Sequence, residues 1–142
     1  MSRDEMMLAT MSAAGEGATF LPVQIQKLFF LIDTEATHLV DGPHFTFEPY
    51  DYGPFDSAVY EELNALKLRA VVEVDANGRY RKYYLTPTGF LKGAQILSSL
   101  PTVTQEYLSK VSRWVVGLNF QELVAAIYKK YPEMKVNSVF KQ

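Results

Sequence analysis

Apolar positions recur at spacings of three and four residues over much of the chain, which is typical of amphipathic helices. The clearest case follows Pro22, because proline is favoured at the first position of a helix. Its apolar stripe contains Ile25, Leu28, Phe29, Ile32, Ala36 and Leu39. The stripe predicts one helix, buried on more than one side, that ends at Asp41-Gly42-Pro43. A shorter helix is predicted over about residues 3–14, where Asp4 and Glu5 suit its N-terminus.

Two regions change to the alternating, β-branched pattern of strands. Residues 45–48 alternate and predict one short strand. Residues 70–74 and 80–85 predict a β-hairpin. Between them, Asn77-Gly78 predicts a tight two-residue turn with both residues at positive φ.

Another amphipathic helix is predicted over residues 54–67, with Pro54 at its first position. Its inner face is apolar and contains Phe55, Val59, Leu63 and Leu66. We expect this face to pack against Phe29 and Ile32 of the preceding helix. Its outer face is acidic and contains Asp56, Glu61 and Glu62.

Three helices are predicted after the hairpin. Thr86-Pro87 caps and begins the first of them. The second spans about residues 102–116 and carries Trp114 on its apolar face, which predicts a core position for this ring. In the third, Asn119 and Glu122 have the spacing of a capping box.

The order of these elements predicts a single α+β domain over residues 1–142, mostly helical. A helix followed directly by a β-hairpin is the core of a winged-helix domain, in which the hairpin is the wing. We therefore expect a winged-helix-like core over about residues 3–98, with helix 54–67 in the place of the recognition helix. Additional C-terminal helices, over about residues 102–132, would pack on this core or form a dimer interface.

Two segments resemble a family of bacterial proteins. Residues 25–33, Ile-Gln-Lys-Leu-Phe-Phe-Leu-Ile-Asp, are similar to the helix "LQKLxFLxD", and residues 50–63 are similar to the segment "YxYGPFxxxVYxxL". In the same proteins, a stretch like Tyr84-Leu85-Thr86, followed by Gly89, comes after the hairpin that forms the wing. These are segments of the Panacea-type antitoxins and proteolysis adaptors. The resemblance implies a winged-helix-like fold, no enzyme activity and a role in binding proteins, often in toxin–antitoxin or phage-defence settings.

Composition narrows the classes of protein. Apolar residues make up 48% and charged residues 21%, as in an ordinary globular protein. No apolar run approaches the length of about 18 residues that a membrane span needs, and the N-terminus lacks the features of a secretory signal, so we expect a cytoplasmic protein. The chain has no cysteine and two histidines, which argues against thiolate or histidine metal sites. With no phosphate-binding loop or catalytic constellation either, we expect no cofactor and no enzyme activity.

Residues 50–55, which we call the elbow, join the predicted strand to helix 54–67. Exposed tyrosines are common anchors in protein interfaces, so the elbow and the acidic helix face are the expected surface for a protein partner. The residues of this surface are Tyr50, Asp51, Tyr52, Asp56, Glu61 and Glu62. The alternative is that the elbow only sets the angle between strand and helix. Lys27, at the border of its apolar stripe, is expected to pair with Asp51.

A DNA-binding function is the alternative to protein binding. Arg79, Arg81 and Lys82 gather at the wing beside Tyr80 and Tyr83 and could contact a DNA backbone, as in a dimeric transcription regulator. The alternative is a solvated hairpin whose charges protect its edges. The acids of helix 54–67 argue against a DNA-binding function because they would repel phosphates.

Charge is distributed unevenly along the chain. Residues 1–69 contain four Lys and Arg against eleven Asp and Glu, a balance of −7, whereas residues 70–142 contain ten against five, a balance of +5. If the two halves formed separate surfaces, the molecule would be electrically polar and would favour a charged partner or a second copy of itself. The alternative is that these charges are simply solvated.

Overall fold

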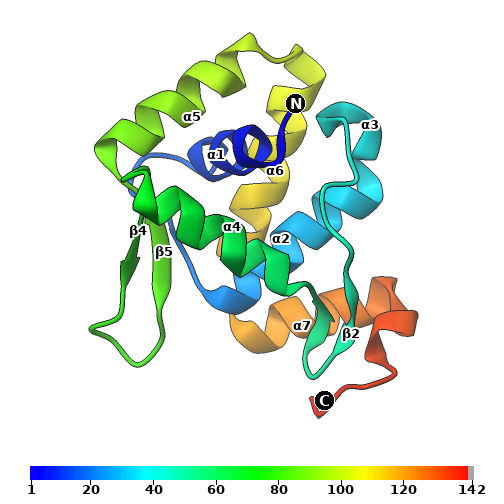
Figure 1. Cartoon of the computed structure of the whole chain (residues 1–142). Helices are drawn as coiled ribbons and strands as arrows, with labels where there is room; N and C mark the ends of the chain where they lie inside the picture. Colours follow the sequence, from blue (N-terminus) through cyan, green and yellow to red (C-terminus); the bar gives the residue numbers. More distant parts are fainter. Residues whose placement is uncertain (141–142) are drawn as a thin grey trace.

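The computed structural model describes residues 1–140 and shows a mostly helical α+β structure (Figure 1). Its helices are α1 (Arg3–Ala13), α2 (Pro22–Glu35), α3 (Thr37–Val40), α4 (Ser57–Leu68), α5 (Pro87–Ser99), α6 (Thr102–Val116), α7 (Phe120–Lys130) and the 3-10 helix η1 (Pro132–Lys135). Its strands are β1 (Thr19–Phe20), β2 (Glu48–Tyr50), β3 (Gly53–Phe55), β4 (Val72–Asp75) and β5 (Lys82–Leu85). The helical character predicted from the sequence is confirmed.

Helices α1 and α2 form the centre of the core. Helix α2 is buried continuously from Gln24 to Asp33, which confirms that it is covered on more than one side. Helices α5 and α6 pack on α1, and α6 and α7 pack on α2, so that α5 and α7 lie at opposite ends of the molecule (Figure 1). The C-terminal helices therefore complete the same core as the N-terminal ones, with Leu108 and Leu123 both fully buried.

The long helix predicted to run to residue 40 is interrupted. Helix α2 ends at Glu35, and the separate turn α3 follows after Ala36, whose φ of −137° is not helical. Because Ala36 and Val40 are both buried, the apolar stripe continues across the break. Periodicity alone could not reveal the interruption.

The β4–β5 hairpin is present, but its tight turn is not. The last paired residues are Asp75 and Lys82, and residues 76–81 form a longer loop in which neither Asn77 nor Gly78 has a positive φ. The side chain of Asp75 accepts a hydrogen bond from the Asn77 amide at 3.0 Å, so an Asx turn directs the chain here. Strand β1 pairs with β5 and adds a third strand, in the order β1-β5-β4.

The elbow is itself a small hairpin, which corrects two predictions. The strand expected at residues 45–48 lies at Glu48–Tyr50, where it pairs with Gly53–Phe55. Pro54 lies in β3 and does not begin a helix, because α4 begins at Ser57. Gly53 permits this hairpin, since its φ of +104° is unfavourable for other residues.

The expected packing of helix 54–67 is confirmed in part. Val59 and Leu63 of α4 are buried in the same core cluster as Phe29 and Ile32. Phe55 is not in that cluster, because it lies in β3 with its ring 5.2 Å from Tyr50.

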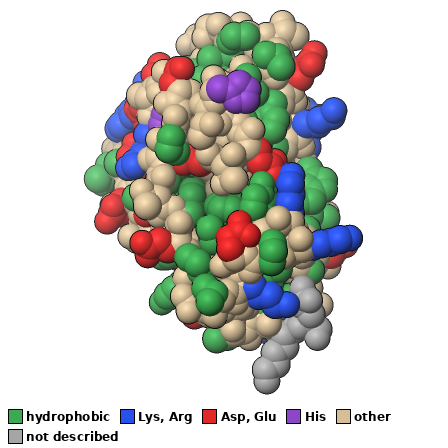
Figure 2. Space-filling view, turned by 90° about the vertical axis from the view of Figure 1, so that its right-hand side faces the viewer, with side chains coloured by type: hydrophobic (Ala, Val, Ile, Leu, Met, Phe, Trp, Pro, Cys, Tyr) green, Lys and Arg blue, Asp and Glu red, His purple; other side chains and the backbone are tan. Residues whose placement is uncertain are grey.

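The acidic and basic halves of the sequence do not form separate surfaces. Helix α1 packs on α5 and α6, and α2 on α6 and α7, so the two halves interlock throughout the core. On the face shown in Figure 2, acidic and basic side chains lie interspersed. The condition under which the molecule would be electrically polar is therefore not met on this face.

Candidate functional site

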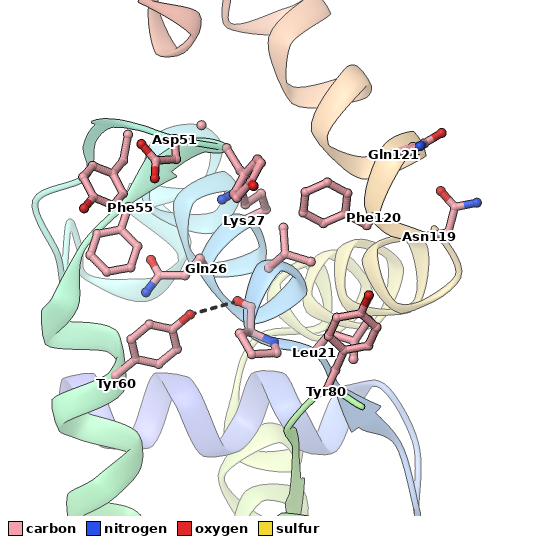
Figure 3. A pocket seen from close by; sticks show the side chains of 15 residues that line it. Leu21, Gln26, Lys27, Asp51, Phe55, Tyr60, Tyr80, Asn119, Phe120 and Gln121 are labelled. Atoms are coloured by element: carbon pink, nitrogen blue, oxygen red, sulfur yellow. Dashed lines mark hydrogen bonds between the residues drawn. The ribbon is translucent and has the colours of Figure 1, made fainter. Parts of the chain in front are cut away.

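A groove of about 950 Å³ opens where the elbow meets three other parts of the chain (Figure 3). The elbow forms one side, the first turn of α7 the opposite side, and Tyr80 of the 76–81 loop closes one end, while the N-terminal half of α2 forms the floor. We call this the elbow groove. Its lining residues are Leu21, Pro22, Val23, Gln26, Lys27, Tyr50, Asp51, Tyr52, Gly53, Phe55, Tyr60, Tyr80, Asn119, Phe120 and Gln121.

Buried polar residues of α2 hold the chain on either side of the elbow. The Gln26 side chain donates to the carbonyl oxygen of Asp56 and accepts from its amide nitrogen, both at 3.0 Å. Two turns further along, Asp33 accepts hydrogen bonds from the amides of His44 and Phe45, at 2.9 and 2.7 Å. The two sequence segments that carry the family resemblance are therefore in direct contact, which favours a structural role for much of their pattern.

Asp33 lies in an unusual electrostatic environment. Both of its backbone hydrogen bonds go to Oδ2, and Oδ1 is buried with no hydrogen-bond partner among the described residues. Burial raises the pKa of this carboxyl, and the two amide donors oppose the rise only in part.

Lys27 lies in the floor of the elbow groove and is only 4% exposed. Its ammonium donates one hydrogen bond, to the carbonyl oxygen of Pro54 at 3.2 Å. The predicted ion pair with Asp51 is wrong: the ion pairs among residues 1–140 involve neither residue. Burial lowers the pKa of Lys27 to about 8.

Gly53 brings the elbow directly onto the Lys27 side chain. A Cβ atom at this position would lie 3.6 Å from Cε of Lys27 and 3.3 Å from the Tyr128 ring. An added Cβ would therefore be in ordinary contact with Lys27 and would press on the Tyr128 ring, in addition to the cost of its positive φ.

Aromatic rings surround the mouth of the groove. Tyr52 makes an edge-to-face contact with Phe120 at 5.0 Å between centroids and remains 43% exposed. Tyr50 and Tyr80 are 55% and 58% exposed. The Tyr60 hydroxyl reaches the carbonyl oxygen of Pro22 across one side, at 3.5 Å (Figure 3). Exposed tyrosines around a hollow are suited to anchor a partner, since each offers a large rigid surface with a polar tip.

The residues predicted to form the partner surface separate into two groups. Tyr50, Asp51 and Tyr52 line the groove. Asp56 is not on the outer face of a helix, as predicted, because it is the N-cap of α4: its carboxylate accepts from the Ala58 amide at 2.9 Å and from the Thr46 amide at 2.7 Å.

The other two acids lie on α4, beyond the groove. Glu61 is exposed and Glu62 is half-buried. Neither residue lines the elbow groove.

The basic cluster lies next to the same groove. Arg79, Arg81 and Lys82 are all exposed. The Arg81 guanidinium lies 5.9 Å from the ring centroid of Tyr60, which lines the groove, and the Arg79 guanidinium lies 5.4 Å from that of Tyr80. The elbow tyrosines and the basic cluster, which the sequence treats as alternative sites, are neighbours.

Trp114 is not a core residue. It is 47% exposed and lines a second, smaller hollow of about 420 Å³ between α2, α6 and α7. Glu35 in this hollow accepts from the Tyr131 hydroxyl and forms an ion pair with Lys130. The apolar face of α6 is wider than the area that its neighbours cover, so periodicity misplaced this ring.

The sequence did not indicate the α7 side of the groove. Phe120 is separated from the elbow by more than sixty residues, and no local pattern associates the two. The only available signal was the capping box at Asn119 and Glu122, which is confirmed and which fixes where α7 begins.

Comparisons with protein-family models, curated proteins and solved structures found no match for this chain. Within residues 1–140, no group of three or more His, Cys, Asp and Glu side chains is arranged to hold a metal ion. The same residues contain no helix long and apolar enough to cross a membrane.

Proposed function

We propose that this protein is a non-enzymatic regulatory protein-binding module, antitoxin-like or adaptor-like as the family resemblance implies, and that the elbow groove is its docking site. The observation that carries the proposal is the meeting of Tyr52, Phe120 and Tyr80, from three distant segments, around one hollow. Aromatic residues that remain exposed around a preformed hollow are the common anchors of protein interfaces.

A winged-helix-like fold is part of this proposal. Helix α4 leads directly into the β4–β5 hairpin, which projects from the molecule as a wing does (Figure 1). Strand β1 pairs with β5 at the base of the hairpin and supports it. Helix α4, in the place of a recognition helix, carries Glu61 and Glu62, which favour a protein partner over a phosphate backbone.

Selection of peptides tests the proposal. A display library of random dodecapeptides is panned against the full chain, and the affinities of the enriched peptides are measured by fluorescence anisotropy. We expect Tyr52→Ala and Phe120→Ala to weaken binding by about tenfold or more, as for anchor residues. Trp114→Ala, an exposed aromatic outside the groove, is the matched control and should change nothing. Failure to enrich any peptide that depends on Tyr52 or Phe120 would contradict the docking site.

DNA binding by a dimer is the second candidate, favoured by the exposure of all three basic residues of the wing. Gel-shift titrations on genomic fragments over a range of salt concentrations test it. If the wing binds DNA, replacing Arg79, Arg81 and Lys82 with Ala should lower the salt slope by roughly one for each lost phosphate contact. Submicromolar, wing-dependent binding at physiological salt would reverse our preference, and sedimentation of the free protein would show whether it is a dimer.

A further inference from the structure

The ammonium of Lys27 is a buried cation without a counter-charge. It has three N–H donors and uses one of them, on the Pro54 carbonyl oxygen. None of the ion pairs among residues 1–140 includes it, although Lys27 is only 4% exposed. Burying a charge of this kind costs free energy unless an opposite charge is paired with it. Because Lys27 lines an open groove, that partner can come from outside the molecule.

We propose that the elbow groove recognises an acidic peptide segment, in which one Asp or Glu carboxylate binds Lys27 and an adjacent apolar or aromatic side chain packs on the rings of Tyr52 and Phe120. This inference rests on the proposed function, since it names the chemistry of the segment that docks in the groove.

The surroundings of Lys27 strengthen such a contact. The groove wall consists mainly of apolar and aromatic side chains, which exclude water and lower the local dielectric, so a charge-assisted hydrogen bond formed there is stronger than one at the surface. Arg81, beside Tyr60, adds a second cation at the wing end of the groove and favours the same sign of ligand.

The geometry fits one recessed carboxylate better than a nucleic-acid backbone. Lys27 lies beneath the elbow, against Gly53 and Pro54, where a row of phosphates cannot follow it. Asp51 also lines the groove, and its charge disfavours a polyanion more strongly than it disfavours a single carboxylate. A single carboxylate can reach the ammonium while the rest of the segment stays at the aromatic mouth.

A matched pair of small probes tests the charge preference directly. The protein is titrated with 3-phenylpropionate and with 3-phenylpropionamide, and ¹⁵N chemical shifts report the site and the affinity. We expect the acid to bind in the elbow groove about tenfold or more tightly than the amide. Lys27→Met should abolish this difference, whereas Lys92→Met, at an exposed position of α5, should preserve it. Equal affinities, or no binding of either probe in the groove up to its solubility limit, would overturn the proposal.

The unmodified protein offers a second measurement, which does not depend on the folding of a variant. Affinity for the acid should fall as the solution is raised from about pH 7 to about pH 9.5, because Lys27 loses its proton, while affinity for the amide should stay constant. The charged and titratable groups that face Lys27 and the groove are Tyr50, Asp51, Tyr52, Tyr60, Tyr80, Arg81 and Tyr128. Burial raises the pKa of Tyr60 and Tyr128, which keeps these two neutral in that range. An acid affinity that does not change with pH would contradict the role of Lys27.

The enriched peptides separate this inference from the proposed function. Changing their Asp and Glu residues to Asn and Gln should weaken binding to the unmodified protein by about tenfold and leave binding to the Lys27→Met variant unchanged. Peptides that need Tyr52 but no acidic residue would overturn the inference and leave the docking site in place. Displacement of 3-phenylpropionate from the groove by a short DNA duplex would show that the groove accepts phosphates and would also overturn it.

Discussion

The side-chain amide of Gln26 pairs with both backbone groups of Asp56, donating to its carbonyl oxygen and accepting from its amide nitrogen, each at 3.0 Å. A buried side chain of α2 thereby takes the place of a neighbouring strand and keeps the chain extended up to the N-cap of α4. Together with the pairing of β2 and β3, this contact fixes the chain that leads into α4, which begins at Ser57 and not at Pro54.

Gln26→Ala should destabilise the fold, because it leaves the amide of Asp56 without a partner in a partly buried position, whereas the Asp56 carbonyl oxygen still accepts from the Val59 amide at 3.1 Å. Such an unpaired group costs about 1–3 kcal/mol. Urea denaturation followed by circular dichroism measures the loss. Gln95→Ala, at an exposed position of α5, is the control and should stay within about 0.5 kcal/mol of the unmodified protein.

Asp56→Ala should lower the free energy of unfolding by about 0.5–2 kcal/mol through loss of the α4 cap. Asp56→Asn should retain most of the stability, since its side-chain oxygen can still accept from the Ala58 amide. Thermal unfolding compares both with Glu61→Ala, which removes an exposed acid of the same helix. An equal effect of Asp56→Ala and Glu61→Ala would show that Asp56 acts only as a surface charge.

Leu63→Ala should cost about 2–5 kcal/mol, because Leu63 is fully buried in the core cluster. Leu68→Ala removes the same atoms from an exposed position near the end of α4 and should have little effect. The two midpoints of chemical denaturation give the comparison. Unchanged unfolding of the Leu63 variant would mean that the inner face of α4 is misassigned.

Gly93→Ala should destabilise the protein even though alanine is the better helix former. A Cβ atom at Gly93 would lie 2.4 Å from the carbonyl oxygen of Leu8, so α1 and α5 would have to separate. Helix propensity alone predicts a gain of about 1 kcal/mol, so the sign of the change decides between the two effects. Gly78→Ala, where the nearest atom is 3.8 Å away, should be tolerated.

The burial of Lys27 predicts a dependence of stability on pH. Its pKa is about 8 in the folded protein, against 10.5 for an ordinary lysine, so the unfolded chain binds more protons between these values. The cost of burying the ammonium is fully present below about pH 8 and is relieved as the solution becomes more basic, so stability should rise by up to roughly 1.4 kcal/mol per pH unit.

The measurement is the difference in unfolding free energy between the unmodified protein and Lys27→Met from about pH 7 to about pH 9.5. The upper limit lies below the pH range in which tyrosines with raised pKa values would lower the stability of the folded protein. Taking the difference cancels the contributions that the two proteins share. A difference that stays constant over this range would show that Lys27 is not buried as a cation.

Features that depend on neighbouring residues were predictable. The caps at Thr86 and Asn119 and the helix start at Pro22 are all where the sequence placed them, because a cap joins groups within three or four residues. The elbow shows the limit of this approach. Pro54 suits both a helix start and a short strand, and the distant side chain of Gln26 decides between them.

The sequence by itself determined most of the helical segments and the presence of the β4–β5 hairpin, and it made the elbow tyrosines candidates for binding, since these follow from periodicity and residue type. Only the tertiary structure decided that Lys27 is buried without a counter-charge, that Trp114 is exposed, and that Phe120 and Tyr80 complete a groove with the elbow. The physical reason is that solvent access and the environment of a charge depend on what packs against a position from elsewhere in the chain. At Lys27 that cover comes from β3 and α7, which are encoded far from it.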